Sequence, residues 1–289
     1  MLLVAGGQLD QNIGRLLKRV LERRTPFFDI LLGPDLIPRI AIDLDDEALV
    51  VNGTVVNPSG CFIRHDVFLQ ETVKTADAHS AALNWYYTVR GWALSQEKIR
   101  VFNRRSYMSE NSKIQNLVSA RRFGLKIPRS IVSNQALEDI ENLPNSLVWI
   151  QKPVAGGSYT TLLSDLQLQS RLEEFPRFIQ PRLLRPEMRV YNVAGRLLAF
   201  RLESPDIDYR ISHNVELTAV EVPDEIRSPL LALCDELGVD FSASDFMLDN
   251  EGDLNFLEIN TQPMFAAFDR VVDGRLCDAI IDHLLSEEN

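Results

Sequence analysis

The stretch SDFMLDNEGDLNFLEIN, residues 244–260, predicts a β-hairpin with acidic side chains near its open end. Apolar and polar residues alternate on both sides of the sequence Asn-Glu-Gly-Asp at 250–253, which is typical of a tight turn between two strands. Glu258 and Asn260 are two residues apart, so their side chains point to the same face of a strand. Folding the hairpin at its turn brings Asp245 close to Glu258. We therefore expect two carboxylates and an amide oxygen to converge at one end of a sheet.

Asp245, Glu258 and Asn260 are candidate metal ligands. A few hard oxygen ligands that leave room for water and phosphate suit Mg²⁺ held jointly with a nucleotide. The motif alone favours a simpler interpretation, polar residues on the wet face of a hairpin, because Asp-Gly turns attract acidic residues. The residues on either side of Glu258 are apolar, however, and a carboxylate in such a strand is costly to bury unless something pairs with it.

Length and composition are those of a globular protein. The chain has 289 residues, of which 45% are hydrophobic and 25% charged, so it can form two or three lobes. No apolar run approaches the ~20 residues of a membrane span, and the N-terminus lacks the basic lead and length of a signal peptide. The formal net charge of −11 disfavours nucleic-acid binding. The three cysteines lack C-x-x-C spacing, so they indicate neither a zinc site nor a disulfide framework. We expect a cytoplasmic protein that binds neither nucleic acid nor membrane.

The pattern of apolar residues predicts an α/β (α+β) fold with three parts. These are an N-terminal α/β lobe at 1–105, a central part at 106–180, and a third part at 181–289 that is rich in antiparallel strands. Helices are expected at 8–24, 72–96, 112–123, 223–237 and 274–285. Strands are expected at 2–5, 27–32, 61–64, 147–153, 188–193, 197–202 and 215–222, with a hairpin over 49–56 whose Asn-Gly pair suits a type I′ turn.

A small-residue loop follows the strand at 147–153 and is a candidate phosphate site. Lys152 ends that strand, and Gly156, Gly157 and Ser158 lie in the loop. Glycines let backbone N–H groups approach phosphates closely, and a lysine adds a point charge. The loop lacks the G-x-x-x-x-G-K-[ST] pattern of a Walker A loop. A flexible hairpin loop is an equal alternative from these residues alone.

Further candidates come from charged residues and from a chain crossing. Lys113 lies near the start of a helix, where a solvated surface lysine is the simpler interpretation. The stretch 180–183 follows an apolar strand, and its proline cannot donate to a β-ladder, which suits an interdomain hinge whose backbone pairs with a purine edge.

Arg189, Arg201 and Arg210 belong to the same part of the chain as the acidic hairpin. Arginines among strand residues usually face solvent, but three together suggest a positively charged site for the phosphate that is transferred and for a substrate carboxylate.

The order of these motifs resembles the ATP-grasp superfamily, and specifically its RimK-like branch. That branch includes the ribosomal-protein glutamate ligases and the peptide macrocyclases of microviridin-type (graspetide) pathways. The resemblance covers roughly residues 100–289. It is strongest at Asp245 with 256–260, and next at Lys152 with Pro153 and the small-residue loop.

Three shorter stretches add to this resemblance. Residues 111–128 resemble the segment that carries the family's first ATP lysine, and residues 187–190 resemble its D/E-hydrophobic-R strand. Residues 62–65 resemble the tryptophan-arginine strand of the peptide-modifying members, although Phe62 and His65 depart from that pattern.

The resemblance implies an ATP-grasp fold: two lobes that sandwich ATP, preceded by an N-terminal lobe that selects the substrate. Lys113 and Lys152 would hold the ATP phosphates, beneath the loop of Gly156, Gly157 and Ser158. The hinge would meet adenine through the residues Gln180, Pro181, Arg182 and Leu183. Glu187 would bind the ribose or orient nearby groups.

The same resemblance implies a metal site and a cationic site. Asp245, Glu258 and Asn260 would hold two Mg²⁺ ions, with Glu258 bridging them and Mn²⁺ as the alternative ion. The γ-phosphate in flight and the attacking carboxylate would be stabilised by Arg189, Arg201 and Arg210.

These observations lead us to expect an ATP-dependent ligase that joins a carboxylate to an amine or a hydroxyl through an acyl phosphate. A peptide or amino-acid substrate is expected because the family branch acts on such substrates. A phosphotransferase on the same scaffold and a non-catalytic nucleotide-binding module are the alternatives. Keeping Asp245, Glu258 and Asn260 together argues against the module, which has no need of all three. The sequence leaves open whether the protein forms a homo-oligomer, and it does not identify the acceptor.

Overall fold

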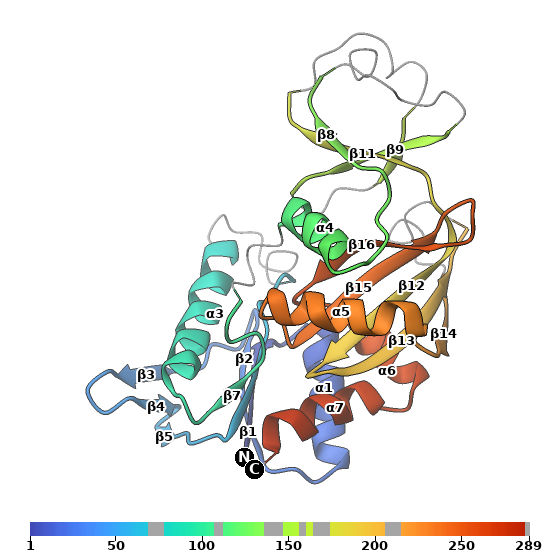
Figure 1. Cartoon of the computed structure of the whole chain (residues 1–289). Coiled ribbons are helices and arrows are strands. Elements are labelled where there is room, and N and C mark those ends of the chain that lie inside the picture. The colour runs from blue at the N-terminus through green and yellow to red at the C-terminus, as the bar shows by residue number, and fades with distance from the viewer. Residues whose placement is uncertain are drawn as a thin grey trace.

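The computed structural model describes most of the chain, as stretches separated by short gaps (Figure 1). The described residues are 1–68, 78–106, 112–135, 147–155, 160–163, 174–205 and 215–286. The helices are α1 (Gln11–Glu22), α3 (Ala78–Ser95), α4 (Lys113–Arg122), α5 (Asp224–Glu236), α6 (Ala266–Val271) and α7 (Arg275–Leu285). In the part of the chain so described, no helix is long and apolar enough to cross a membrane.

A parallel sheet forms the N-terminal lobe. In spatial order its strands are β2 (Phe27–Leu32), β1 (Leu2–Gly7), β6 (Gly60–Ile63) and β7 (Arg100–Val101). Leu2 and Val4 join a core with α1 and α7, whereas Leu3 and Ala5 join a core with α3. This alternation follows from the two-residue period of a strand. Helices therefore cover both faces of the sheet, as is usual for parallel strands.

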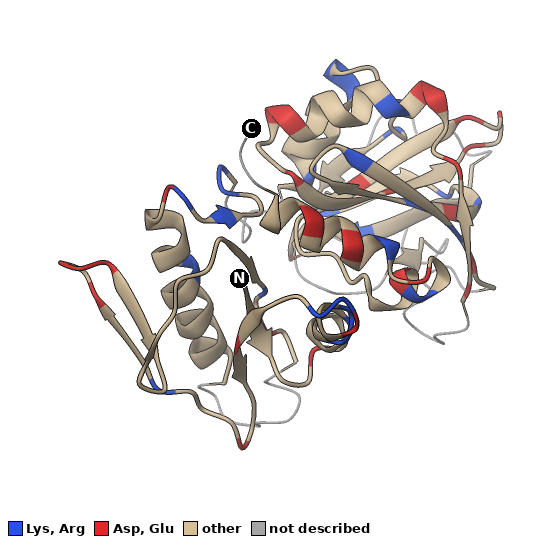
Figure 2. Ribbon diagram, turned by 90° about the horizontal axis from the view of Figure 1, so that it is seen from below, with Lys and Arg blue, Asp and Glu red and all other residues tan. Residues whose placement is uncertain are grey.

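A small antiparallel sheet projects from this lobe. It consists of β3 (Ile40–Asp43), β4 (Ala48–Val51) and β5 (Thr54–Val55). Asn52 and Gly53 have φ angles of 50° and 82°, which confirms the predicted Asn-Gly turn. The tip between β3 and β4 is rich in acidic residues, which are red on the ribbon of Figure 2. The strand β3 was not predicted from the sequence.

The central lobe contains a four-stranded antiparallel sheet. Its strands in spatial order are β10 (Thr161–Leu162), β9 (Trp149–Pro153), β11 (Arg177–Pro181) and β8 (Ile131–Ser133). The sheet lies at the top of Figure 1 and has a small core around Trp149 and Ile179. The chain leaves it at Pro181 and enters the largest sheet at Leu184, so the predicted hinge at 180–183 lies at the crossing between the two sheets.

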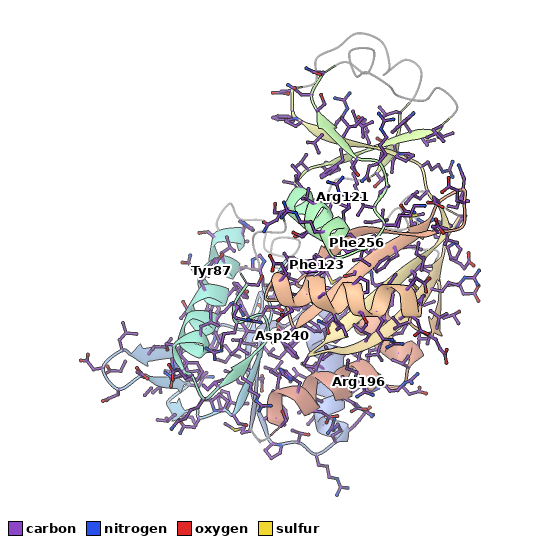
Figure 3. All side chains as sticks on the ribbon, viewed as in Figure 1. Tyr87, Arg121, Phe123, Arg196, Asp240 and Phe256 are labelled. Atoms are coloured by element: carbon purple, nitrogen blue, oxygen red, sulfur yellow. The ribbon has the colours of Figure 1, made fainter. Side chains whose placement is uncertain are left out.

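The C-terminal lobe is built on a five-stranded antiparallel sheet. Its strands in spatial order are β14 (Glu216–Val220), β13 (Arg196–Glu203), β12 (Leu184–Val193), β15 (Phe241–Leu248) and β16 (Leu254–Asn260). One face packs against α4 and α5, with Phe256 between the sheet and α4 (Figure 3). The other face packs against α6, α7 and α1. The helix α4 thus joins the C-terminal lobe, although it precedes the central sheet in sequence.

The mixed α/β fold agrees with the sequence prediction. Four predicted helices are confirmed with slightly shorter bounds, as α1, α4, α5 and α7. The predicted helix at 72–96 appears as α3, and its first residues lie outside the described part of the chain. The short helix α6 was not predicted, because six residues are too few to reveal a helical period.

Candidate active site

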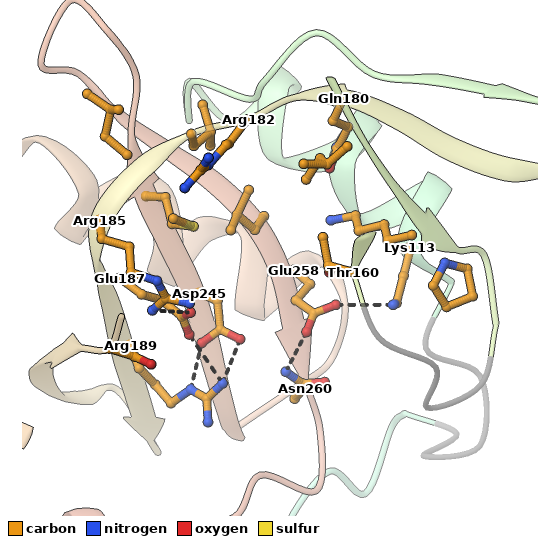
Figure 4. Close-up of a pocket in the computed structure, with 18 of the residues that line it drawn as sticks. Lys113, Thr160, Gln180, Arg182, Arg185, Glu187, Arg189, Asp245, Glu258 and Asn260 are labelled. Atoms are coloured by element: carbon orange, nitrogen blue, oxygen red, sulfur yellow. Dashed lines mark hydrogen bonds and ion pairs between the residues drawn. The ribbon is translucent and has the colours of Figure 1, made fainter. Parts of the chain in front are cut away.

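A cavity of about 550 Å³ lies between the central sheet and the five-stranded sheet (Figure 4). Strands β9 and β11 and the start of α4 line one side, and β12, β15 and β16 line the other. The predicted site residues that line it are Lys113, Lys152, Gln180, Pro181, Arg182, Leu183, Glu187, Arg189, Asp245, Glu258 and Asn260. Residues predicted for phosphate, adenine and metal binding therefore share one cavity.

The hairpin of β15 and β16 brings the acidic residues together as predicted. Asp245 pairs directly with Glu258 in the antiparallel register. A β-bulge follows, because the next pair is Phe246 with Phe256, which leaves Leu257 as an extra residue. Phe256 is consequently in the core, while both Leu257 and Glu258 line the cavity. The sequence did not predict this bulge.

Asp245 and Arg189 form a buried two-pronged ion pair between β15 and β12. The Nε and Nη2 atoms of Arg189 donate to the two carboxylate oxygens of Asp245 at 2.6 and 2.8 Å. The side chain of Arg189 is only 9% exposed and that of Asp245 only 6%. Burial raises the pKa of Asp245, and the charge of Arg189 opposes this rise.

Glu187 extends this cluster along β12. Its carboxylate lies 3.7 Å from Nη2 of Arg189 and 3.9 Å from Nη1 of Arg185. Burial, together with the negative charge of Asp245, raises the pKa of Glu187 to about 7, against the opposing charges of the two arginines. Positive and negative groups therefore alternate along this wall of the cavity.

Two lysines approach Glu258 from the opposite wall. The Nζ atom of Lys113 lies 3.3 Å from Oε2 of Glu258. Burial acts to raise the pKa of Glu258, but the charges of Lys113 and Lys152 outweigh it and lower that pKa. Burial lowers the pKa of Lys152, with Glu258 opposing the change. Asn260 donates from Nδ2 to Oε1 of Glu258 at 3.4 Å. Lys113 of α4 and Lys152 of the central lobe thus attract Glu258 of the acidic hairpin across the cavity.

The chain crossing from β11 to β12 supplies polar backbone and apolar side chains at the cavity. Gln180 is buried and donates from Nε2 to Oγ of Ser130 at 2.7 Å. The N–H of Arg182 donates to the carbonyl of Val148 at 2.8 Å. Leu183, Met247 and Leu257 are partly buried and line the same cavity. Met247 and Leu257 lie on β15 and β16, so the crossing and these strands together offer the apolar surface that a planar base requires.

The described residues of the hairpin offer a donor set that suits Mg²⁺. The side chain of Glu258 is 26% exposed, and it faces the cavity together with Asn260. Asp245 accepts two hydrogen bonds from Arg189, but a carboxylate has about four lone-pair sites, so acceptor capacity remains. Two carboxylates and an amide are the hard oxygen ligands that Mg²⁺ prefers.

One predicted site residue lies elsewhere, and four lie outside the described residues. Arg201 pairs with Met188 on β12, so it projects from the face of the sheet opposite to Arg189. Its side chain is 51% exposed and forms an ion pair with Glu203. The structure therefore does not bring Arg201 to the cavity. Outside the described residues lie Gly156, Gly157, Ser158 and Arg210.

Several cavity residues were not predicted. Arg185 lies two residues before Glu187 on β12, and the same period of two could have placed it beside Glu187 and Arg189. Gln262, Pro263 and Met264 also line the cavity. They follow Asn260 closely in sequence, but no local pattern shows that this segment turns back along the cavity.

Comparisons with known proteins identify the fold. No protein-family model matches the sequence, and no curated protein matches it. Solved structures do match over nearly the full length. A RiPP-associated ATP-grasp ligase from Chryseobacterium gregarium, in complex with ADP and a leader and core peptide, is 20% identical with a TM-score of 0.78. The match covers 100% of this chain and 97% of that one.

Two further structures agree. The ATP-grasp ligase PsnB, complexed with a minimal precursor, is 22% identical with a TM-score of 0.77, and the match covers 97% of each chain. The macrocyclase MdnC from Microcystis aeruginosa MRC, bound with precursor peptide MdnA, is 16% identical with a TM-score of 0.76, over 99% of this chain and 100% of that one. The chain therefore has the ATP-grasp fold. The structural similarity includes the N-terminal lobe, where the sequence motifs resemble those of the family only loosely.

Proposed function

We propose that this protein is an ATP-dependent ligase that joins a carboxylate to an amine or a hydroxyl through an acyl phosphate. One observation carries the proposal: in a chain with the ATP-grasp fold, Asp245, Glu258 and Asn260 line the same cavity as Lys113 and Lys152. Cations for phosphate and oxygen ligands for a metal are the two components that ATP-dependent phosphoryl transfer requires.

In this proposal ATP lies along the cavity. The crossing at 180–183 meets the adenine, and Lys113 and Lys152 hold the phosphates beneath the loop at 156–158. Asp245, Glu258 and Asn260 hold two Mg²⁺ ions, which offset negative charge on the triphosphate when bound. The arrangement is supported by the ion pair of Lys113 with Glu258, since it brings a phosphate-binding cation next to the metal ligands.

Arg189 and Glu187 form the acceptor end of the proposed site. A carboxylate is a poor electrophile, and phosphorylation gives it a leaving group. Arg189 can stabilise both the carboxylate and the phosphoryl group that passes to it, because a guanidinium carries five N–H donors and a fixed positive charge, and Asp245 takes two of those donors. Glu187 is held beside Arg189 and orients it. Arg210 is proposed for the same region as Arg189, on the resemblance alone.

A peptide is the proposed substrate class. Three of the similar structures were solved with a precursor, leader or core peptide. The cavity is also lined by Ser204, Pro205 and Met264, which the proposed ATP and metal sites do not use, and the peptide is proposed to contact these residues. The acyl phosphate is hydrolysable, so closure of the cavity over the peptide would be needed to exclude water.

Trapping of the acyl phosphate tests the proposal. The purified protein is incubated with Mg-ATP, hydroxylamine and a set of acidic peptides, and ADP and peptide masses are followed. We expect ADP release that depends on peptide, together with peptide hydroxamates. A phosphorylated peptide that resists hydroxylamine would instead identify a phosphotransferase. Nucleotide binding without turnover for any peptide would favour the non-catalytic module.

A further inference from the structure

The segment that follows Asn260 forms one wall of the cavity and is held from outside the cavity. Gln262, Pro263 and Met264 line the cavity, and Phe265 begins the turn into α6. The segment belongs to no strand or helix, so its position depends on bonds to other parts of the chain. Asn260 is the last residue of β16 and pairs with Ala243, so the strand holds this proposed metal ligand on one side and the segment adjoins it on the other.

Arg64 of the N-terminal lobe makes two of these bonds. Its Nη1 donates to the carbonyl of Pro263 at 2.9 Å, and its Nη2 donates to Sδ of Met264 at 3.1 Å. The same guanidinium donates from Nε to Oδ2 of Asp10 at 2.6 Å. The side chains of Arg64 and Asp10 are 4% and 0% exposed. One buried ion pair therefore clamps the segment to the end of β6.

Asn12 continues the clamp from the first turn of α1. Its side-chain oxygen accepts hydrogen bonds from the N–H groups of Phe265 and Ala266 at 2.7 and 2.9 Å. Its Nδ2 donates to Asp10 at 2.7 Å and to Sδ of Met264 at 3.1 Å. Asn12 thus links the Arg64–Asp10 pair to the beginning of α6.

Two other contacts hold the same segment. The N–H of His65, the residue after Arg64, donates to Oε1 of Gln262 at 2.9 Å. From the five-stranded sheet, the hydroxyl of Tyr191 donates to the carbonyl of Met264 at 2.5 Å. The segment is therefore held between the N-terminal lobe and β12, directly beside the metal ligands.

Arg64 is not among the described residues that line the cavity, so it acts on the site only through this segment. A buried ion pair contributes little net stability compared with apolar residues of similar size, but it can specify a geometry. Residues that hold metal ligands in position without touching the metal affect metal affinity strongly.

We propose that Arg64, together with Asp10 and Asn12, is a positioning element of the N-terminal lobe. It holds the segment that follows Asn260 in the position that Mg²⁺-dependent nucleotide binding requires. The inference rests on the proposed function, since it concerns the same nucleotide and metal site. It assigns to the N-terminal lobe a part in forming that site, in addition to substrate selection.

The test compares Arg64 with a matched arginine. Arg15 on α1 also donates from Nε to a buried carboxylate at 2.6 Å, that of Asp269 on α6, and so joins the same two parts of the chain without contacting the segment. The variants are R64M, R64K, R15M and Met264→Leu, each in the full chain. Calorimetry measures the binding of AMP-PNP over a range of Mg²⁺ concentrations, and thermal melting without nucleotide measures stability.

We expect R64M to raise the Mg²⁺ concentration for half-maximal AMP-PNP binding by about tenfold or more. R64K should recover part of this loss, because an ammonium still pairs with Asp10, and Met264→Leu should show a smaller shift. R15M should lower the melting temperature without changing the Mg²⁺ dependence. If R64M does not fold, R64K and Met264→Leu give the same comparison.

Two results would overturn the inference: the same Mg²⁺ dependence in all folded variants, or an equal shift in the Arg15 and Arg64 variants. Failure of the proposed nucleotide and metal site would look different, because the unsubstituted protein itself would then bind no AMP-PNP at any Mg²⁺ concentration. A protein that binds AMP-PNP but turns over no peptide would contradict only the proposed ligase activity.

Discussion

Arg189 donates both hydrogen bonds of its fork to Asp245 on the neighbouring strand, at 2.6 and 2.8 Å. A residue predicted to act on substrate and a residue predicted to bind metal are thus one buried pair. Arg189 also packs over the ring of Phe268, 5.4 Å from its centroid, so a second contact supports its orientation toward Asp245.

Removing one partner of this pair should be costly. Arg189→Met leaves Asp245 buried without its counter-charge, so we expect the free energy of unfolding to fall by about 3–5 kcal/mol. Urea denaturation measures this change. Arg201→Met is the matched control on the adjacent strand, and it should change stability by at most about 0.5 kcal/mol because Arg201 is largely exposed. Equal losses in the two variants would contradict the structural role of the pair.

Glu258→Gln should abolish ATP turnover and leave the fold intact. The substitution keeps the size of a side chain that faces the cavity, but it removes the charge that a metal ligand needs. We expect ADP release to fall by about 100-fold or more, with an unchanged circular dichroism spectrum. Glu251→Gln, on the exposed turn of the same hairpin, is the control and should turn over normally. Undiminished turnover by Glu258→Gln would refute the metal assignment.

Lys152→Ala should weaken nucleotide binding. Lys152 is partly buried, with its ammonium over the ring of Phe178 and near Glu258, so alanine removes a positive charge that the structure holds at the cavity. We expect the Kd for ATP to rise by about 10- to 100-fold, which corresponds to about 1.4–3 kcal/mol. Isothermal calorimetry measures the change, with Lys18→Ala on the exposed face of α1 as the control. An unchanged affinity would move the phosphate site elsewhere.

A second acidic cluster lies at the turn of the same hairpin, where Lys126 offsets part of its negative charge. Its Nζ lies 2.7, 3.2 and 2.7 Å from carboxylate oxygens of Asp249, Glu251 and Asp253. Partial burial acts to raise the pKa of Asp249, but the hydrogen bond from Lys126 lowers that pKa well below its usual value. These three carboxylates are close enough to hold a cation, and the lysine supplies one from within the chain.

The lowered pKa of Asp249 predicts an acid-dependent loss of stability. A carboxyl whose folded pKa is below its unfolded pKa stabilises the fold above pH ~4, and this contribution is lost as the pH falls through the folded value. Lys126→Met should therefore lower the free energy of unfolding at neutral pH, and the difference from the unsubstituted protein should shrink below pH ~4. Urea denaturation over a pH series measures both effects. A difference that stays constant with pH would contradict the ion-pair explanation.

The sequence predicted the hairpin and the convergence of its acidic residues well because both follow a two-residue period. Asp245 lies opposite Glu258 as the turn at 250–253 implied, and Asn260 shares their cavity. The same period, applied across strands, would have separated Arg201 from Arg189. Pairing of Arg189 with Phe200 turns Arg201 to the other face. That register is set by the two-residue turn at Ala194 and Gly195, so counting outward from the turn would have shown it.

The remaining features of the site could not be predicted for physical reasons. The bulge at Leu257 adds one residue without any distinctive local sequence. The clamp joins Asp10, Asn12 and Arg64 to a segment about 200 residues or more away, so no spacing in the sequence indicates it.

The apolar cluster that contains Leu2, Val4 and Phe62 of the first sheet also contains Tyr191, Phe200 and Phe241 of the largest one. Helices α1, α6 and α7 contribute to the same cluster, so the beginning and the end of the chain share a single interior. Neither terminal half can bury these rings alone. Chemical denaturation should consequently unfold both sheets in one cooperative step. A chain truncated before α6 should expose a large apolar surface and aggregate.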